Sequence, residues 1–362
     1  MNSCLLWTIL APALTLNGAE APHAVTVDPN AVAVKEFVGY GAEWDPRGYD
    51  FYGVTDEEFA VVRERVEWMR LPVARIMMLA KWCYLGKDAF DYDTREMHLL
   101  YRQLDICQSL GTTVLLTDWG CEREWVQPPG ISKTDDPRYA QVIATYMEHL
   151  VNVKGYSCIE YFILVNEPNY EVGDFDRWAR GVRNVAAAFA ERGLDKHVRI
   201  AGPDHSNADE WLFKAVDQLK DVLGAYDVHR YATDQNVAPG KLEEYFARQW
   251  RYALQHDPAA SGKIFIVGEA GMNDHAKHPI ANAKIDTHYY GEFMADYAIQ
   301  AAQAGSHAVC FWHLDDNSHQ NFEWGLWSNK EEGMGLRPCF GPWALLARYV
   351  PAGATIYNVP DP

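Results

Sequence analysis

Short apolar runs alternate with longer amphipathic stretches between residues 35 and 353. In the longer stretches, such as residues 55–70 and 94–111, apolar positions recur every three or four residues, which is the period of a helix. The short runs are apolar at nearly every position, as in strands buried on both faces of a parallel sheet. We count eight such runs, at residues 37–44, 73–79, 112–119, 158–165, 198–204, 226–231, 263–269 and 307–314.

Eight strands with helices between them predict an α/β fold, the closed (β/α)8 or TIM barrel. The alternative is an open, doubly wound parallel sheet. No G-x-G-x-x-G motif follows the first run, which weakens the dinucleotide-binding form of that alternative. No stretch rich in Pro, Gly or Ser divides the chain. We therefore expect residues 22–362 to form a single catalytic domain.

Polar and aromatic residues stand at or near the ends of all eight runs. This matters because functional residues of a (β/α)8 barrel lie at the carboxyl ends of its strands, around one mouth. In chain order the candidates are Glu43 and Trp44, Arg75, Asp118 and Trp119, Asn166 and Glu167, Asp204 and His205, His229 and Tyr231, Glu269, and Trp312 and His313.

Two carboxylates among these positions suggest a reaction. Glu167 and Glu269 follow the fourth and seventh runs without a break, so they should face each other across the mouth. Opposed carboxyl groups are what glycoside hydrolysis needs, one as acid and the other as nucleophile or base. A separation of about 5–5.5 Å would predict retention of the anomeric configuration, and about 6.5–9.5 Å would predict inversion.

The motifs around these carboxylates resemble those of glycoside hydrolase clan A, the retaining barrel enzymes. They are "NEPN" at residues 166–169, "AGPD" at residues 201–204 and "GE" at residues 268–269. The pattern is most similar to family 5, the cellulase-like enzymes, with some likeness to family 39. It departs from family 5 at the third strand, where "TDWG" at residues 117–120 stands in place of the usual histidine.

The resemblance implies a role for each matching residue. Glu167 would be the acid/base, and repulsion from an ionised Glu269 would help it hold its proton. Glu269 would be the nucleophile, kept ionised by Arg75 and Tyr231. The substrate-binding residues would be Arg75, Asn166 (which would bond the sugar 2-hydroxyl), His229, Tyr231 and Trp312 (the floor under the sugar), with further sugar contacts expected from Glu43, Trp44 and Trp119.

Composition narrows the substrate. The net charge of −18 argues against nucleic acid and anionic membranes, whose phosphates need clustered Lys and Arg. Thirteen Trp and twenty Tyr exceed the needs of a core and suit stacking on sugar rings. We expect a neutral oligo- or polysaccharide substrate, such as a β-glucan or mannan. A carbohydrate-binding pseudoenzyme and a transglycosylase remain alternatives on the same barrel.

The sequence carries little sign of a cofactor or metal. His275 and His278 lie in a polar loop without further ligands at metal spacing. We therefore predict a metal-free protein that needs no cofactor. Residues 1–21 resemble a signal peptide, which predicts a secreted or periplasmic protein. Export would permit a disulfide between Cys83 and Cys121, and that pairing stays open, as does the oligomeric state.

Overall fold

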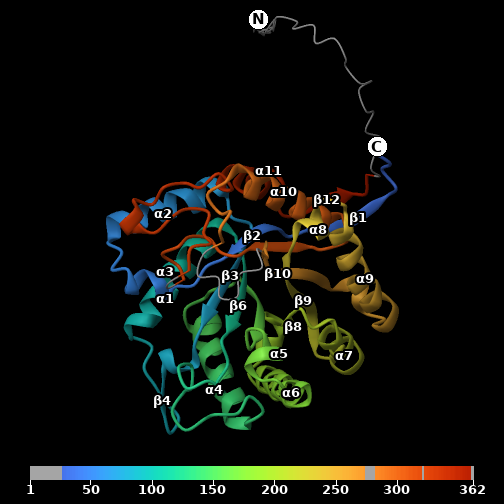
Figure 1. Cartoon of the computed structure of the whole chain (residues 1–362). Coiled ribbons are helices and arrows are strands. Elements are labelled where there is room, and N and C mark those ends of the chain that lie inside the picture. The colour runs from blue at the N-terminus through green and yellow to red at the C-terminus, as the bar shows by residue number, and fades with distance from the viewer. Residues whose placement is uncertain (1–26, 274–281, 320–321, 360–362) are drawn as a thin grey trace, which may run out of the picture.

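The computed structural model describes residues 27–273, 282–319 and 322–359. Eight parallel strands close into a barrel, which confirms the predicted TIM-barrel class (Figure 1). The predicted signal peptide at residues 1–21, the start of the predicted domain and the loop histidines His275 and His278 lie outside the described residues. Around the barrel the strands follow the order β10 (Ile264–Met272), β11 (Ala308–Phe311), β2 (Gly39–Glu43), β3 (Val73–Met78), β6 (Thr113–Asp118), β7 (Ile159–Leu164), β8 (Arg199–Ser206) and β9 (Leu223–Ala232).

The apolar runs form strands because both of their faces are buried. All six residues of β3 are buried, and so are all five of β2. Side chains that alternate inward fill the barrel interior, including Val73, Leu115 and Ile163. The outward-facing side chains join a larger core that lies under the surrounding helices. Each of the eight predicted runs overlaps one barrel strand.

Helices surround the barrel, as the helical periods predicted (Figure 1). Their starts follow capping rules: Thr55 and Glu58 form a reciprocal capping box on the first long helix, and Asp136 caps a helix whose first residue is Pro137. The long helices are α2 (Asp56–Met69), α3 (Arg95–Leu110), α4 (Pro137–Glu148), α6 (Phe175–Glu191), α7 (Asp209–Leu219), α9 (Lys241–His256), α10 (His288–Gln303) and α11 (Phe340–Tyr349). The short helices are α1 (Arg47–Phe51), α5 (Pro168–Glu171) and α8 (Asp234–Val237).

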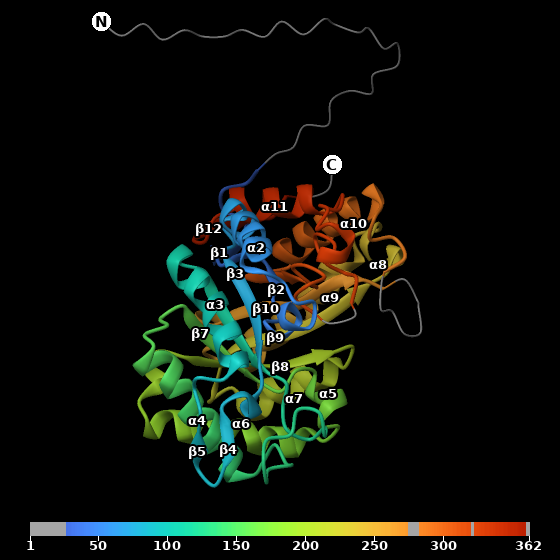
Figure 2. The ribbon, with the colours of Figure 1, turned by 90° about the vertical axis from the view of Figure 1, so that its left-hand side faces the viewer.

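Two small sheets outside the barrel were not predicted. Strand β1 (Val32–Phe37) pairs antiparallel with β12 (Ala354–Tyr357), and β4 (Tyr84–Gly86) pairs with β5 (Ala89–Phe90). Figure 2 shows the first sheet close to α10 and α11, and the second near α4 on the opposite side of the barrel. The first predicted run thus begins in β1. Gly39, with a φ of 144°, marks the turn into the barrel strand.

The six cysteines in the described residues are all buried and free. Cys83 and Cys121 are therefore not joined, and Cys310 is a buried thiol. Within the described part of the chain, no helix is long and apolar enough to cross a membrane.

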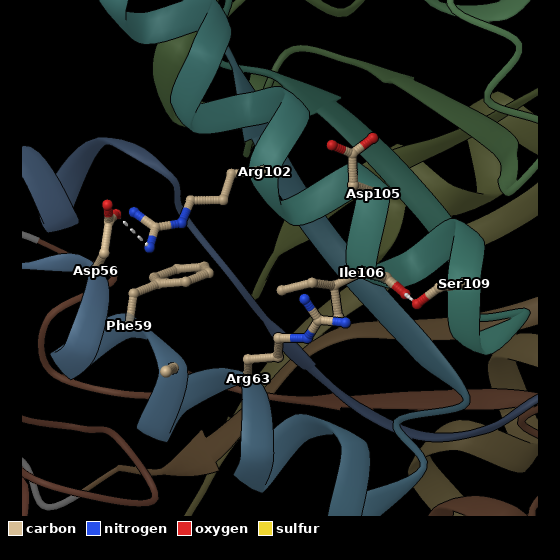
Figure 3. A pocket seen from close by; sticks show the side chains of 8 residues that line it. Asp56, Phe59, Arg63, Arg102, Asp105, Ile106 and Ser109 are labelled. Carbon is tan, nitrogen blue, oxygen red and sulfur yellow. Dashed lines mark hydrogen bonds and ion pairs between the residues drawn. The ribbon is translucent and has the colours of Figure 1, made fainter.

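A groove on the outer wall lies between α2 and α3 (Figure 3). Its floor includes Phe59, and the guanidinium of Arg102 lies 3.6 Å from the centre of that ring while pairing with Asp56 at 3.0 Å. The other arginine, Arg63, pairs with Glu67 at 2.6 Å. Because its cations are already paired with carboxylates, the groove offers no concentrated charge to a ligand, and the strand ends hold the more reactive groups.

Candidate active site

Arg75 on β3 lies at the centre of a buried cluster at the barrel mouth. One of its terminal nitrogens donates to Glu269 Oε1 at 2.9 Å, and the other donates to Asn166 Oδ1 at 2.7 Å and to Asp204 Oδ2 at 2.8 Å. The Arg75 side chain is fully buried. Burial lowers its pKa, but Asp204 and Glu269 outweigh burial and raise the pKa above the usual value, so Arg75 stays charged.

Four of the predicted site residues, Glu167, Glu269, His229 and Tyr231, lie close together at the barrel mouth. His229 Nδ1 lies 3.0 Å from Glu167 Oε1 and 3.5 Å from Glu269 Oε2. The Tyr231 hydroxyl donates to Glu269 Oε2 at 2.7 Å. An oxygen of Glu167 lies within 4.8 Å of an oxygen of Glu269. The strand ends therefore place two carboxylates in facing positions, with a histidine between them.

The backbone turns sharply where Glu167 leaves the strand. Val165 and Glu167 both adopt positive φ, at 71° and 43°. Such angles are uncommon for residues other than glycine and cluster at functional sites. Pro168 begins α5 directly afterwards, because proline suits the first position of a helix. The turn leaves the Glu167 side chain 23% exposed, whereas that of Glu269 is 4% exposed.

Burial has a larger effect on the pKa of Glu269 than the neighbouring positive charges, which the sequence alone did not indicate. Its contacts with Arg75 and Tyr231 are those we predicted. Burial raises the pKa of Glu269 nevertheless, and the charges of His229 and Arg75 oppose this without reversing it. The carboxylate should therefore take up its proton at a higher pH than an exposed glutamate would.

Asp204 bridges the arginine and the histidine of the cluster, a role that the sequence did not reveal. Its Oδ1 lies 2.9 Å from His229 Nε2, and its Oδ2 accepts from Arg75. Burial lowers the pKa of His229, but Asp204 and Glu269 outweigh it and raise that pKa well above the usual value. The ring is therefore held as a cation whose two nitrogens face carboxylates.

Asp227 lies next to this cluster, one repeat of the strand pleat before His229 on β9. It lies on β9 two residues before His229, and Tyr231 follows two residues later, so all three side chains point to the barrel interior. Asp227 Oδ1 accepts from the backbone N–H of Gly268 at 2.9 Å. Burial and the neighbouring Asp204 raise the Asp227 pKa well above its usual value. The two-residue spacing in "DVHRY" was the signal that could have identified it.

We predict an acid-labile contribution to stability from Asp204. Burial raises the pKa of this carboxyl, but Arg75 and His229 outweigh burial and hold it at about 2. A pKa below the unfolded value stabilises the fold at pH values above the unfolded pKa, and this stabilisation is lost as the pH falls toward the folded pKa. Between pH 5 and pH 2 the loss should be about 2 kcal/mol.

The measurement is urea unfolding of the wild type and of Asp204→Asn at both pH values. The variant should be less stable than the wild type at pH 5. Its free energy of unfolding should fall by about 2 kcal/mol less than that of the wild type between pH 5 and pH 2. Equal losses in the two proteins would contradict the assignment of Asp204 as an ionised bridge.

We predict that Arg75→Met destabilises the fold by about 3–5 kcal/mol, because it leaves buried carboxylates without their cation. The matched control is Arg63→Met, which removes an exposed pair with Glu67 on α2 and should cost about 0.5 kcal/mol or less. Chemical unfolding of both variants at pH 7 provides the comparison. Equal losses would mean that the buried network contributes no more than a surface pair.

Aromatic side chains form one side of the mouth. Trp312, Trp324 and Met77 form a small buried cluster against which Trp119 and Tyr231 pack. Trp312 follows β11 and is 6% exposed. Trp125 in the loop after β6 is 45% exposed and meets Trp119 edge-on, with ring centres 5.3 Å apart. Of these side chains, that of Trp125 is the most exposed.

One predicted aromatic contact, that of Trp44, needs correction. Trp44 is fully buried, stacks on Phe59 of α2 and donates from its indole N–H to Tyr49 at 2.7 Å. It is therefore a core residue with no surface for a sugar. Strand alternation explains this, because Glu43 before it points into the barrel.

Three groups of carboxylates and histidines in the described residues are close enough to share a cation. Two of them belong to the cluster above: Glu167, His229 and Glu269, and Asp204, Asp227 and His229. Arg75 already supplies a positive charge to both, and both His229 nitrogens face carboxylates, so an additional ion would be disfavoured there. The third group contains Glu43, Asp45 and His319.

The fold is similar to that of several solved glycoside hydrolases, and two of these are enzymes of family 39, the family to which the sequence motifs showed some likeness. It resembles the GH39 enzyme from Xanthomonas axonopodis pv. citri with a TM-score of 0.65 and 15% identity, over 94% of this chain and 71% of that one. It also resembles a GH39 β-xylosidase from Caulobacter crescentus, with a TM-score of 0.60 and 13% identity, over 93% and 76%.

A third similar structure is the α-L-arabinofuranosidase from Thermotoga maritima, with a TM-score of 0.64 and 14% identity, over 92% of this chain and 75% of that one. No protein-family model and no curated protein matches the sequence. At these identities the likeness concerns the fold, and the chemistry has to be argued from the site.

Proposed function

We propose that this protein is a retaining β-glycoside hydrolase that acts on a neutral oligo- or polysaccharide. The observation that carries the proposal is the approach of Glu167 and Glu269 oxygens to within 4.8 Å across the mouth. We propose direct attack by Glu269 because retaining enzymes hold their carboxyl groups about 5–5.5 Å apart, whereas inverting enzymes hold theirs about 6.5–9.5 Å apart to admit a water.

The proposed reaction has two steps. In the first, Glu269 attacks the anomeric carbon while Glu167 gives its proton to the departing glycosidic oxygen, which leaves a glycosyl ester on Glu269. In the second, Glu167 takes a proton from water, the water oxygen attacks the same carbon, and Glu269 departs as a carboxylate. Two inversions at one carbon give net retention.

The neighbouring residues prepare the two carboxylates for these steps. Arg75 and Tyr231 bond one oxygen each of Glu269, which orients the nucleophile and stabilises its charge as it departs. His229 lies against both carboxylates, and Asp204 holds the ring in place. Asn166, fixed by Arg75, is the candidate for the sugar 2-hydroxyl, a contact that strengthens in the transition state.

Two other functions use the same barrel. A carbohydrate-binding pseudoenzyme would need neither carboxylate, yet both are present with hydrogen-bonding partners that suit catalysis. A transglycosylase would follow the same first step and pass the sugar to an acceptor hydroxyl instead of water. Hydrolysis is our proposal, and product analysis with and without an added sugar acceptor separates it from transfer.

The test is a panel of aryl glycosides with NMR detection of the first product anomer. It includes β-glucosides, β-mannosides, β-xylosides and an α-L-arabinofuranoside, since similar folds include an exo-β-1,4-mannosidase, a β-xylosidase and an α-L-arabinofuranosidase. We expect hydrolysis of at least one β-glycoside with retention. Inversion would exclude the double displacement, and activity on the α-L-arabinofuranoside alone would exclude the β-specificity.

We also propose export of the protein, on the basis of the signal-like residues 1–21. The prediction is that the mature N-terminus begins at Pro22 in protein recovered from the medium or periplasm. N-terminal sequencing checks this, and an intact Met1 in protein from the cell interior would contradict it.

A further inference from the structure

Glu43, Asp45 and His319 lie beside the proposed active site and take no part in the reaction above. One oxygen or nitrogen from each lies within 4.8 Å of the others. All three side chains are buried, Glu43 completely. Glu43 ends β2 next to Arg75 on β3, whereas His319 belongs to the segment after β11. Folding therefore joins residues from opposite ends of the chain into one small polar group.

Glu43 is the unusual member of this group. Neither of its carboxyl oxygens has a hydrogen-bond partner among the described residues. The nearby Arg75 directs its terminal nitrogens to Glu269, Asn166 and Asp204 instead. A fully buried carboxyl group without a partner is costly, so it needs either a proton or a cation.

Asp45 and His319 are held so that they face the same point as Glu43. Asp45 Oδ1 accepts from the backbone N–H of Arg47 at 2.8 Å, which leaves Oδ2 at 3.3 Å from His319 Nδ1. The Arg47 guanidinium also approaches Oδ2 at 3.3 Å and offsets part of the negative charge. The His319 ring packs against Trp312, with ring centres 5.0 Å apart, which restricts its rotation.

We propose that Glu43, Asp45 and His319 form a binding site for one divalent metal ion at the barrel mouth. Two carboxylate oxygens and one imidazole nitrogen suit Zn²⁺ or Mn²⁺ better than Ca²⁺, which prefers an all-oxygen shell. Three protein ligands leave coordination positions open for water or for a hydroxyl of a ligand. The site does not depend on the proposed glycosidase activity, because its ligands are not the carboxylates that would react.

The test is calorimetric titration of chelator-treated protein with Zn²⁺ and, separately, Mn²⁺, without substrate. We expect about one tight equivalent in the wild type and at least a tenfold weaker affinity in Glu43→Gln and in His319→Ala, as for loss of a metal ligand. Two controls should bind as the wild type does. His98→Ala disrupts an exposed His–Asp pair at 2.7 Å. The double variant His275→Ala/His278→Ala removes the loop histidines.

Thermal unfolding gives a second measurement that also checks folding. Added Zn²⁺ should raise the Tm of the wild type and of both controls by more than that of Glu43→Gln, because an ion that binds only the folded state stabilises it in proportion to its affinity. Wild-type affinity that persists in both site variants would overturn the proposal. So would the absence of Zn²⁺ and Mn²⁺ binding in the wild type, which would leave Glu43 as a protonated carboxyl group. If Glu43→Gln does not fold, His319→Ala alone decides.

Discussion

Replacing Glu269 by alanine is expected to lower kcat on an aryl β-glycoside by about 10⁴-fold or more, the scale seen when a nucleophile is removed from an enzyme. The reason is that the variant cannot form the glycosyl ester. Arg75 and Tyr231, which now bond Glu269, would face an empty position. Initial rates on the best substrate of the panel measure the effect.

Azide distinguishes a lost nucleophile from a damaged fold. It is small enough to enter the space left by the side chain, and direct attack on a β-glycoside would give the α-glycosyl azide. We expect azide to restore part of the rate in Glu269→Ala with that product. The matched control is Glu64→Ala, an exposed carboxylate on α2, which should keep wild-type activity. Full activity in Glu269→Ala would refute the role of nucleophile.

Replacing Glu167 by alanine should give a loss that depends on the leaving group. General acid catalysis contributes about 10²–10⁴-fold, and it matters most when the departing oxygen is basic. The variant should therefore lose activity strongly on a natural oligosaccharide but form the glycosyl ester almost normally from a dinitrophenyl glycoside. Burst kinetics with the activated substrate and steady-state rates with the oligosaccharide test this contrast.

The second step provides the control for Glu167→Ala. Without a general base the ester should accumulate, and azide should release it as the β-glycosyl azide, the opposite product from that of Glu269→Ala. An equal loss on both substrates, with no azide product, would show that Glu167 contributes to structure and not to proton transfer. The two variants together thus assign each carboxylate by the configuration of its rescued product.

The barrel class could be predicted because each strand and helix carries its own local signal. Continuous apolar runs and three-to-four-residue periods can be recognised without knowledge of the fold, and eight apolar runs with helices between them are compatible with few architectures. The sheets β1–β12 and β4–β5 were missed because they are short. β1 also pairs with a strand from the far end of the chain, and no local pattern records such a pairing.

The residues of the candidate site could be predicted only as far as the carboxyl ends of the strands could be located in the sequence. Placing Glu167 after β7 and Glu269 in the last part of β10 sufficed to bring them together. The error at Trp44 arose from treating neighbouring positions alike, although alternate side chains of a strand point to opposite faces. Applying that rule would have assigned Glu43 to the interior and Trp44 to the helix side.

The sequence by itself determined the number of barrel strands, their order along the chain and the two carboxylates Glu167 and Glu269 near their carboxyl ends, because these depend on local periodicity and chain connectivity. Only the tertiary structure decided the choice of partners: Asp204 between Arg75 and His229, and His319 beside Glu43 and Asp45. Only the tertiary structure also showed that the pKa of Glu269 is raised. The physical reason is that burial and electrostatic contacts depend on groups far apart in sequence, whose distances are set when the barrel closes.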